Sequence, residues 1–342
     1  MNSKEAILEA MAGHRTAVPP AAVFTQSATM DLMDRTGCSW PEAHSDPDRM
    51  VGLALGISRF CGMYSARVPF CVSAEAERLG CRVRIGGRTA GPMVIASPYA
   101  PADRSFGTVV DPPELMSEEE FSTAGRTAVI LAALEKLHRQ HGGDLAVVAG
   151  VTGPLTLLTQ LLGAEPMLYS MVTAPASIRA WMVRLKPLLS GYIQRLSDAG
   201  ADIVQMAEAS ASPDLIAPAD FRRFAGDYLG CLTGVKGACT SLHICGEATA
   251  IIENMVLTGV DALSLDSHVD PLVAAAVVHG RAVLIGNVGP IRALMTGTPT
   301  EVKQDARAAV AAGFGIIAPG CGIPVTTPTA NLQALAHYAE KD

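Results

Sequence analysis

Short apolar runs alternate along the chain with longer stretches in which apolar residues recur every three or four positions. Runs rich in Val, Ile, Leu and Ala are typical of strands buried on both faces, and the longer spacing is typical of amphipathic helices. Eight runs are predicted strands: residues 21–26, 67–73, 145–151, 202–208, 240–245, 262–266, 282–287 and 315–319. Parallel strands connected by helices close most readily into a (β/α)8 barrel.

The segments between the strands support this α/β prediction. Residues 247–258 and Pro299–Ala312 have helical spacing and fit two of the gaps. An open, doubly wound sheet is the alternative fold, but its glycine-rich phosphate motif should follow a strand. The nearest match, residues 313–318, lies at the start of the last predicted strand instead. We therefore predict a single (β/α)8 TIM barrel domain over residues 1–342.

Two segments depart from the alternation of strands and helices. Residues 1–20 are predicted to form a short amphipathic N-terminal helix ended by two prolines. Residues 81–97 alternate between apolar and polar positions around a Gly-Gly pair, which predicts a β-hairpin. Residues 98–120 are rich in Pro, Asp, Ser and Gly, a composition typical of loops. Residues 81–120 are thus predicted to form a hairpin and loop excursion from the barrel after strand two.

Composition narrows the functional class. The chain is 49% hydrophobic, has a formal net charge of −7, and contains no basic cluster longer than Arg222-Arg223. Binding to nucleic acid or to an anionic membrane is therefore not expected. No apolar run approaches the roughly 18 residues of a membrane span, and the N-terminal residues lack the apolar region of a secretory signal. A cytoplasmic location is predicted, with most of the eight cysteines present as reduced, buried side chains.

A histidine and two cysteines form the most informative polar pattern. His243 and Cys245 end the predicted strand 240–245, and residues two apart on a strand point to the same side. Cys321 follows the last predicted strand between two glycines. In a barrel, both segments lie at the C-terminal face, where barrel enzymes hold their active sites. One imidazole and two thiolates give zinc three ligands and leave a fourth position open, as in catalytic sites. The alternative is that the three side chains only pack against their neighbours.

Three more polar residues end predicted strands on the same face. Glu208, Asp266 and Asn287 follow the fourth, sixth and seventh strands. Charged groups at the ends of apolar strands require water, a partner or a metal, so these residues are candidates for catalytic roles. The alternative is that they cap helices or lie solvated in loops.

The pattern His243-Ile-Cys245-Gly, combined with Cys321 in Pro-Gly-Cys-Gly-Ile-Pro, resembles the zinc signature of the methylcobamide:coenzyme M methyltransferases. These belong to the uroporphyrinogen decarboxylase superfamily of (β/α)8 barrels. The resemblance extends over nearly the whole chain. Further similar stretches are 25–29 (TQSAT), 39–47 (SWPEAHSDP), 67–71 (RVPFC), 209–213 (ASASP), 265–271 (LDSHVDP) and 286–290 (GNVGP). The last two are shared with the decarboxylase and indicate the fold more than the reaction.

One stretch distinguishes the methyltransferases from the decarboxylase itself. The decarboxylase has an Arg-Gln-Ala-Gly-Arg motif after its first strand, whose arginines hold the carboxylates of a tetrapyrrole. Thr25 and Thr29 stand at the two arginine positions here. A substrate with several carboxylates would lose its bidentate partners. The resemblance therefore favours methyl transfer over a decarboxylase-like lyase.

The resemblance implies a mechanism and a set of partners. Zn²⁺ held by His243, Cys245 and Cys321 would bind and ionise a small thiol such as coenzyme M, which would take the methyl group of a methylcobamide. Glu208 is the candidate labile fourth ligand or proton acceptor, and Asp266 and Asn287 would orient ligands or substrate.

The sequence leaves the corrinoid carrier and the methyl acceptor open. No Asp-x-His-x-x-Gly stretch is present, so the methylated corrinoid is expected on a partner carrier protein. Methyl transfer to tetrahydrofolate or homocysteine stays open, as does a non-catalytic corrinoid- or metal-binding barrel.

Overall fold

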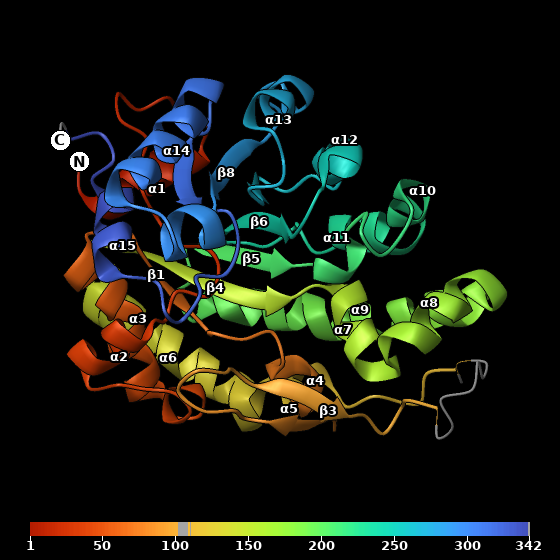
Figure 1. Cartoon of the computed structure of the whole chain (residues 1–342). Helices are drawn as coiled ribbons and strands as arrows, with labels where there is room; N and C mark the ends of the chain where they lie inside the picture. The colour runs from red at the N-terminus through yellow and green to blue at the C-terminus, as the bar shows by residue number, and fades with distance from the viewer. Residues whose placement is uncertain (102–108, 110, 341–342) are drawn as a thin grey trace.

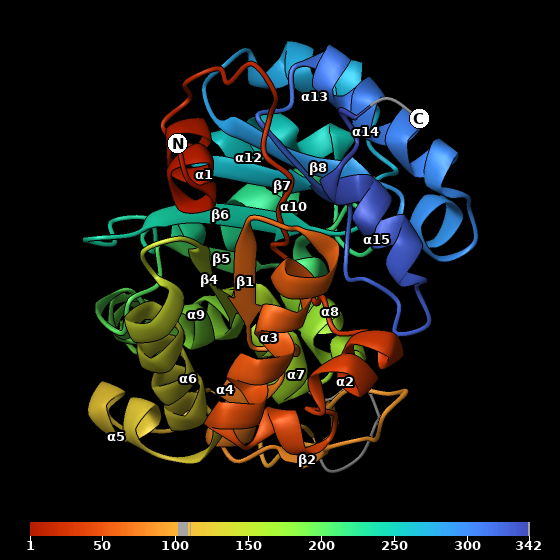
Figure 2. The same cartoon turned by 90° about the vertical axis from the view of Figure 1, so that its left-hand side faces the viewer.

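Seven parallel strands form one curled sheet at the centre of the molecule (Figures 1 and 2). The computed structural model describes residues 1–101, 109 and 111–340. The strands are β1 (Ser65–Val68), β4 (Ala146–Thr152), β5 (Ile203–Ala207), β6 (Cys239–Ile244), β7 (Ala262–Leu265), β8 (Val283–Val288) and β9 (Ile316–Pro319), and they are hydrogen-bonded in this order. The predicted α/β class is confirmed, and seven of the eight predicted runs overlap a strand. The run predicted over 67–73 overlaps it least, because β1 ends at Val68. The sheet of the described residues has seven strands, so the predicted eight-stranded barrel is not confirmed.

The first predicted strand, residues 21–26, is wrong as a strand. It is reduced to an isolated parallel bridge between Ala21 and Ile317. The Ala22 N–H donates to the Ile317 carbonyl over 2.9 Å, and the Tyr64 N–H donates to the Ala21 carbonyl over 2.9 Å. The segment therefore lies between β9 and the start of β1 without extending a ladder along either edge.

The sequence around this bridge explains why no strand forms. Pro20 has no N–H to donate. Val23 donates its N–H to the side-chain oxygen of Ser65 over 2.8 Å, and that hydroxyl returns a bond to the Val23 carbonyl. A side chain thus takes the place of the backbone partner that a ladder requires, and apolar composition alone did not reveal this.

The helices of the described residues surround the curled sheet (Figure 1). They are α1 (Ser3–Met11), α2 (Met30–Thr36), α3 (Pro47–Cys61), α4 (Ala74–Arg78), α5 (Glu118–Thr123), α6 (Gly125–His141), α7 (Pro154–Leu162), α8 (Ala164–Thr173), α9 (Pro175–Asp198), α10 (Pro218–Phe221), α11 (Asp227–Gly230), α12 (Ile252–Val256), α13 (Pro271–Val278), α14 (Pro299–Ala312) and α15 (Thr329–Ala336). The predicted helix 299–312 is confirmed as α14. The predicted helix 247–258 is shorter, with a 3₁₀ turn before α12.

The two predicted departures from the alternation are described only in part, and the excursion over 81–120 as a whole stays a prediction. The N-terminal helix α1 ends at Met11, well before the two prolines. Strands β2 (Arg82–Arg84) and β3 (Met93–Ala96) pair antiparallel as a separate two-stranded sheet. Of the loop predicted over 98–120, residues 102–108 and 110 lie outside the described residues.

The interior of the curled sheet is filled by apolar side chains at the end where the strands begin. Helix α1 lies across this end, as Figure 2 shows from that side. Its Lys4 pairs with Asp202, just before β5, over 2.7 Å. One buried cluster joins α1 to the inward positions of the sheet: Ile7, Ala10, Met11, Ala22, Phe24, Ala146, Val148, Ile203, Ala262, Ile285, Ile316 and Ala318. The opposite end, where the strands finish, is therefore the place for a site.

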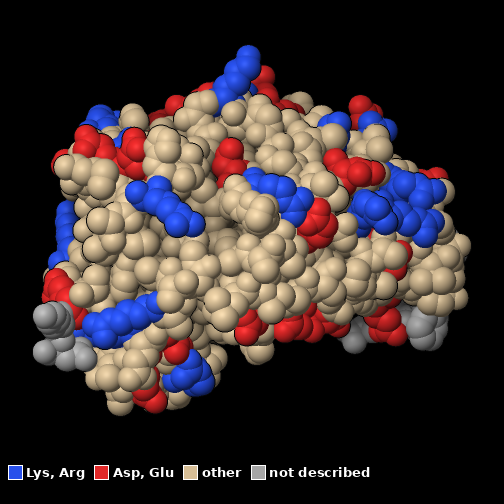
Figure 3. Space-filling view, turned by 90° about the horizontal axis from the view of Figure 1, so that it is seen from above, with Lys and Arg blue, Asp and Glu red and all other residues tan. Residues whose placement is uncertain are grey.

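The surface charge and the length of the helices bear on the predicted partners and location. Figure 3 shows Lys and Arg beside Asp and Glu over one face of the molecule, separated by wide areas of other residues. None of the helices in the described ranges is long and apolar enough to cross a membrane. The cytoplasmic location and the absence of nucleic acid partners stay predictions.

Candidate metal centre

The structure brings the three predicted metal ligands together at the C-terminal end of the sheet. His243 Nε2 lies 3.2 Å from Cys245 Sγ, and Cys245 Sγ lies 3.3 Å from Cys321 Sγ. All three ligand atoms lie within 4.8 Å of one another. The imidazole is buried and the two thiols are half-buried. Residues separated by more than seventy positions therefore converge in the arrangement that the sequence predicts.

Two glycines allow this convergence. Gly246 turns the chain away after Cys245 with φ of +80°, in the left-handed region, and a side chain there would overlap the Asp214 carboxylate. Gly320 precedes Cys321, and a side chain at Gly320 would overlap the backbone that follows β7. Larger residues at either position would move a cysteine away from the centre.

The orientation of the imidazole is set by β7. His243 Nδ1 lies 3.1 Å from both the carbonyl and the hydroxyl oxygen of Ser264. When Nδ1 carries the proton and donates it there, Nε2 presents a lone pair toward the cysteines, as a metal-bound histidine does. Ser264 was not among the site residues predicted from the sequence. Its signal was a polar residue at an inward position of an apolar strand, two residues before Asp266.

The two thiols lie within hydrogen-bonding distance of each other. Cys245 donates a hydrogen bond to Cys321, which lowers the pKa of Cys321 and raises the pKa of Cys245, and burial of the sulfur atoms also opposes ionisation. Two thiolates this close require a cation between them to ionise together. Two sulfurs and one imidazole nitrogen are the donor set of three-ligand zinc sites. The residues therefore fit the predicted metal.

Asp266 and Asn287 hold the loops around this centre. One Asp266 oxygen accepts the Gly246 N–H over 3.1 Å, and the other accepts the His268 N–H over 3.1 Å and lies 2.8 Å from that ring's Nδ1. Asn287 Nδ2 donates to the carbonyl of Asp266 over 3.1 Å and to that of Val269 over 2.8 Å. Both residues thus fix the positions of neighbouring segments, and their role in orienting ligands or substrate stays a prediction.

Glu208 is fully buried and faces the first turn of α7. Its carboxylate accepts the N–H of Leu155 over 2.9 Å, and the N–H and hydroxyl of Thr156 over 2.6 and 2.5 Å. Its own N–H donates to the His243 carbonyl over 2.9 Å. Burial raises the pKa of this carboxyl to about 7, against the opposing effect of these donors. Among the described residues, the group of candidate ligand atoms does not include Glu208.

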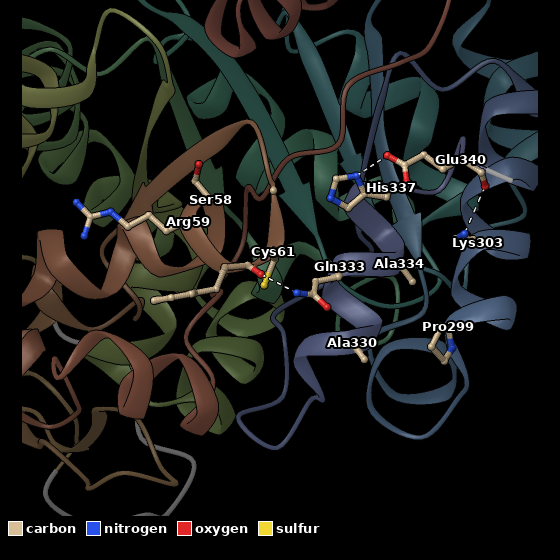
Figure 4. A pocket seen from close by; sticks show the side chains of 12 residues that line it. Ser58, Arg59, Cys61, Pro299, Lys303, Ala330, Gln333, Ala334, His337 and Glu340 are labelled. Atoms are coloured by element: carbon tan, nitrogen blue, oxygen red, sulfur yellow. Dashed lines mark hydrogen bonds and ion pairs between the residues drawn. The ribbon is translucent and has the colours of Figure 1, made fainter. Parts of the chain in front are cut away.

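A groove of about 510 Å³ lies away from this centre, between the end of α3 and helices α14 and α15 (Figure 4). Gln333 Nε2 donates to the Phe60 carbonyl over 3.0 Å, and the His337 ring lies 2.9 Å from the Glu340 carboxylate. None of the predicted site residues lines it. The groove is therefore separate from the candidate metal centre.

The fold and the site define the class of protein. The family model described as uroporphyrinogen decarboxylase (URO-D) matches residues 2–341. The chain belongs to this family.

The individual proteins that this chain resembles have more specific descriptions than the family model. The chain is 30% identical over 334 residues to the methylcobamide:CoM methyltransferase MtaA of Methanosarcina barkeri, covering 97% of this chain and 96% of that protein. It is 31% identical to the methylcobamide:CoM methyltransferase MtbA of Methanosarcina acetivorans, covering 94% and 92%. A solved structure, a methyltransferase from Methanosarcina mazei, aligns with a TM-score of 0.90 and 29% identity over 99% of this chain and 98% of that chain. The predicted resemblance and the prediction of a methyltransferase enzyme are confirmed.

Proposed function

We infer that the protein transfers the methyl group of a methylcobamide to a small thiol at a zinc site held by His243, Cys245 and Cys321. The convergence of these three ligand atoms within 4.8 Å at the C-terminal end of the sheet carries the inference. The relatives described as methylcobamide:CoM methyltransferases support it. Zinc bound there would lower the pKa of a thiol at its open position, so that the thiol reacts as a thiolate at neutral pH.

The protein ligands suit this chemistry by their charge. Two thiolates and one neutral imidazole balance the charge of a divalent cation, so they leave the acceptor thiolate its nucleophilic character. The acceptor sulfur forms the new bond to the methyl carbon as the cobalt–carbon bond breaks, and the electron pair of that bond stays on cobalt. The products are a thioether and a Co(I) corrinoid.

Glu208 is the group that would take the thiol proton. Its pKa near 7 suits a proton acceptor at neutral pH. A role as labile fourth ligand would require the carboxylate to give up its hydrogen bonds to Leu155 and Thr156. Proton acceptance therefore agrees better with its contacts.

The first test combines metal analysis with a spectroscopic assay. The purified protein should contain about one zinc per chain, the stoichiometry of a mononuclear site. It should demethylate free methylcobalamin, which is followed by the visible spectrum, when supplied with coenzyme M, homocysteine or tetrahydrofolate in turn. Turnover with one of them names the acceptor. A protein with neither zinc nor demethylation would contradict the proposed function and leave the lyase and the non-catalytic barrel.

A partner protein carrying the corrinoid would have to cover the C-terminal end of the sheet. Leu215, Leu272 and Ile291 follow β5, β7 and β8 at this end, and their side chains are at least half exposed. The β2–β3 hairpin is the proposed remainder of this rim; of the segment 81–120 that the sequence predicts there, residues 102–108 and 110 lie outside the described residues. Apolar side chains exposed together are typical of protein interaction sites.

A charge at this rim should weaken carrier docking alone. Leu272→Asp is expected to lower the rate with the methylated carrier protein about tenfold or more, because docking would bury the new carboxylate without a partner. The rate with free methylcobalamin should not change. Leu257→Asp is the matched control, since Leu257 is 66% exposed against 67% for Leu272 but lies at the end of α12, away from the rim. Equal losses with both methyl donors would contradict a docking role.

A further inference from the structure

Two arginines lie on a π-helical turn beside the rim of the sheet. Arg222 and Arg223 are exposed residues of η3 (Arg222–Gly226), which continues α10 without a break. The segment follows β5 and begins just after Leu215, one of the exposed side chains of the rim. In Figure 1, α10 lies on the side toward which the arrows of β4 and β5 point. The two guanidinium groups are therefore close to the end of the molecule that holds the candidate metal centre.

Helix α9 adds two more cations to this part of the surface. Arg179 and Lys186 are exposed and seven residues apart on α9, so they lie on the same side of the helix. The turn η3 packs against α9, and Tyr228 follows it on α11. Burial raises the pKa of Tyr228, and the charges of Arg179 and Lys186 oppose this rise. Both therefore lie near Tyr228, and together with Arg222 and Arg223 they form what we call the basic surface.

The four cations of the basic surface have no carboxylate partner within the described residues. Other cations of the chain do have one: Lys4, Arg35, Arg88, Arg126, Lys136, Arg195, Arg281 and Arg292. Asp220 and Asp227 are the carboxylates of residues 218–230. Four cations against two carboxylates leave a surplus of two positive charges, on a chain whose formal net charge is −7.

The composition of this surface fits a protein partner. Val183 is 62% exposed and lies between Arg179 and Lys186 on the same side of α9. Arginine and exposed apolar side chains together are typical of protein interfaces. Nucleic acids and anionic membranes require longer runs of cations, and the net negative charge of the chain repels such polyanions. A protein with a local acidic face meets only the basic surface and is attracted to it.

We propose that the basic surface docks an acidic face of the protein that carries the methylated corrinoid, and that it steers this carrier onto the C-terminal end of the sheet. The inference rests on the proposed function, because it takes the methyl donor's carrier as the partner. The carrier has to cover the rim for the methyl group to reach the metal centre, and the basic surface continues that rim past Leu215. Complementary charges speed up association and fix the orientation of docking more than they tighten the final complex.

Charge reversal and added salt test this docking together. The double variant Arg222→Glu, Arg223→Glu should lower kcat/KM for the carrier protein loaded with methylcobalamin about tenfold or more at low ionic strength, because attraction becomes repulsion. Its rate with free methylcobalamin should stay within about twofold of the wild type, because a small donor needs no docking surface. Raising potassium chloride from about 50 to about 500 mM should slow the wild type with the carrier severalfold and leave the variant nearly unchanged, because salt screens exposed charges.

Two further variants separate docking from structural damage. Lys186→Glu changes the basic surface on α9 instead of η3, so it should reproduce part of the loss with the carrier. Arg184→Glu is the matched control, because Arg184 is an exposed cation of the same helix. It lies about 140° around the helix from Arg179, outside the basic surface. This control should keep the carrier rate and the salt dependence of the wild type, and all variants should keep its melting temperature.

Binding of fluorescently labelled poly-L-glutamate gives a readout that needs neither a corrinoid nor turnover. At low ionic strength this acidic polypeptide should bind the wild type at least about fivefold more tightly than the double variant, because the variant repels it. If methyl transfer is absent but this difference is seen, the proposed function fails and a surface for an acidic protein stands.

Other outcomes overturn the docking surface and leave the function standing. One is methyl transfer in which the double variant reacts with the carrier as fast as the wild type. Another is equal binding of poly-L-glutamate to both proteins. Tighter binding of duplex DNA or of phosphatidylglycerol vesicles than of poly-L-glutamate, through the same two arginines, would assign the basic surface to a nucleic acid or a membrane instead.

Discussion

Replacing Cys245 by alanine is expected to abolish both zinc binding and methyl transfer. The change leaves His243 and Cys321 as two ligands, one fewer than a catalytic zinc site needs. It also removes the hydrogen bond that lowers the pKa of Cys321, so the remaining thiol is harder to ionise. Zinc content measured after gel filtration should fall from about one to below about 0.1 per chain, and demethylation of methylcobalamin should fall to background.

Cys239→Ala is the matched control for this variant. Cys239 is a half-buried free cysteine on the same strand, β6, four residues before His243. It should keep both zinc and activity. Full zinc occupancy in Cys245→Ala would contradict the ligand assignment. Loss of zinc from both variants would show that the strand, and not the Cys245 thiol, had been disturbed.

The strands and the convergence of His243, Cys245 and Cys321 could be predicted because most of their signals are local. Buried parallel strands require continuous apolar runs, and seven of these runs correspond to strands. The alternation of side chains along β6 places His243 and Cys245 together without knowledge of any distant contact. Residues 21–26 have a similar composition, but the Val23 bond to the Ser65 side chain is a contact across more than forty positions that no local pattern contains.

The environment of the site could not be predicted, because distant partners decide it. In the sequence, Glu208 is an acidic residue at the end of a predicted strand. In the fold, its carboxylate faces the first turn of α7, which lies more than fifty residues earlier in the chain. Arg222 and Arg223 are an isolated basic pair in the sequence. Only the packing of η3 against α9 brings Arg179 and Lys186 to the same part of the surface. The role of each of these residues therefore depends on the hydrogen-bond partners that the fold gives it or withholds from it.

Glu208→Gln is expected to retain zinc and to slow methyl transfer about a hundredfold or more. The amide has nearly the shape of the carboxylate but cannot take the thiol proton, and a positioned general base commonly contributes factors of this size. Its Oε1 can still accept from Thr156, while its NH₂ group faces a backbone donor, so some stability is lost as well. Zinc content, urea unfolding and methylcobalamin demethylation should be measured on the same preparation.

Comparing thiols of different acidity separates proton acceptance from a structural role. A more acidic thiol such as 2,2,2-trifluoroethanethiol needs less help to ionise, so Glu208→Gln should slow its reaction far less than that of 2-mercaptoethanol. Glu75→Gln removes another buried carboxylate, which bonds to Thr152, and should slow both thiols by the same factor. Equal slowing of both thiols by Glu208→Gln would assign Glu208 to the support of α7. Loss of zinc from it would instead favour the fourth-ligand role.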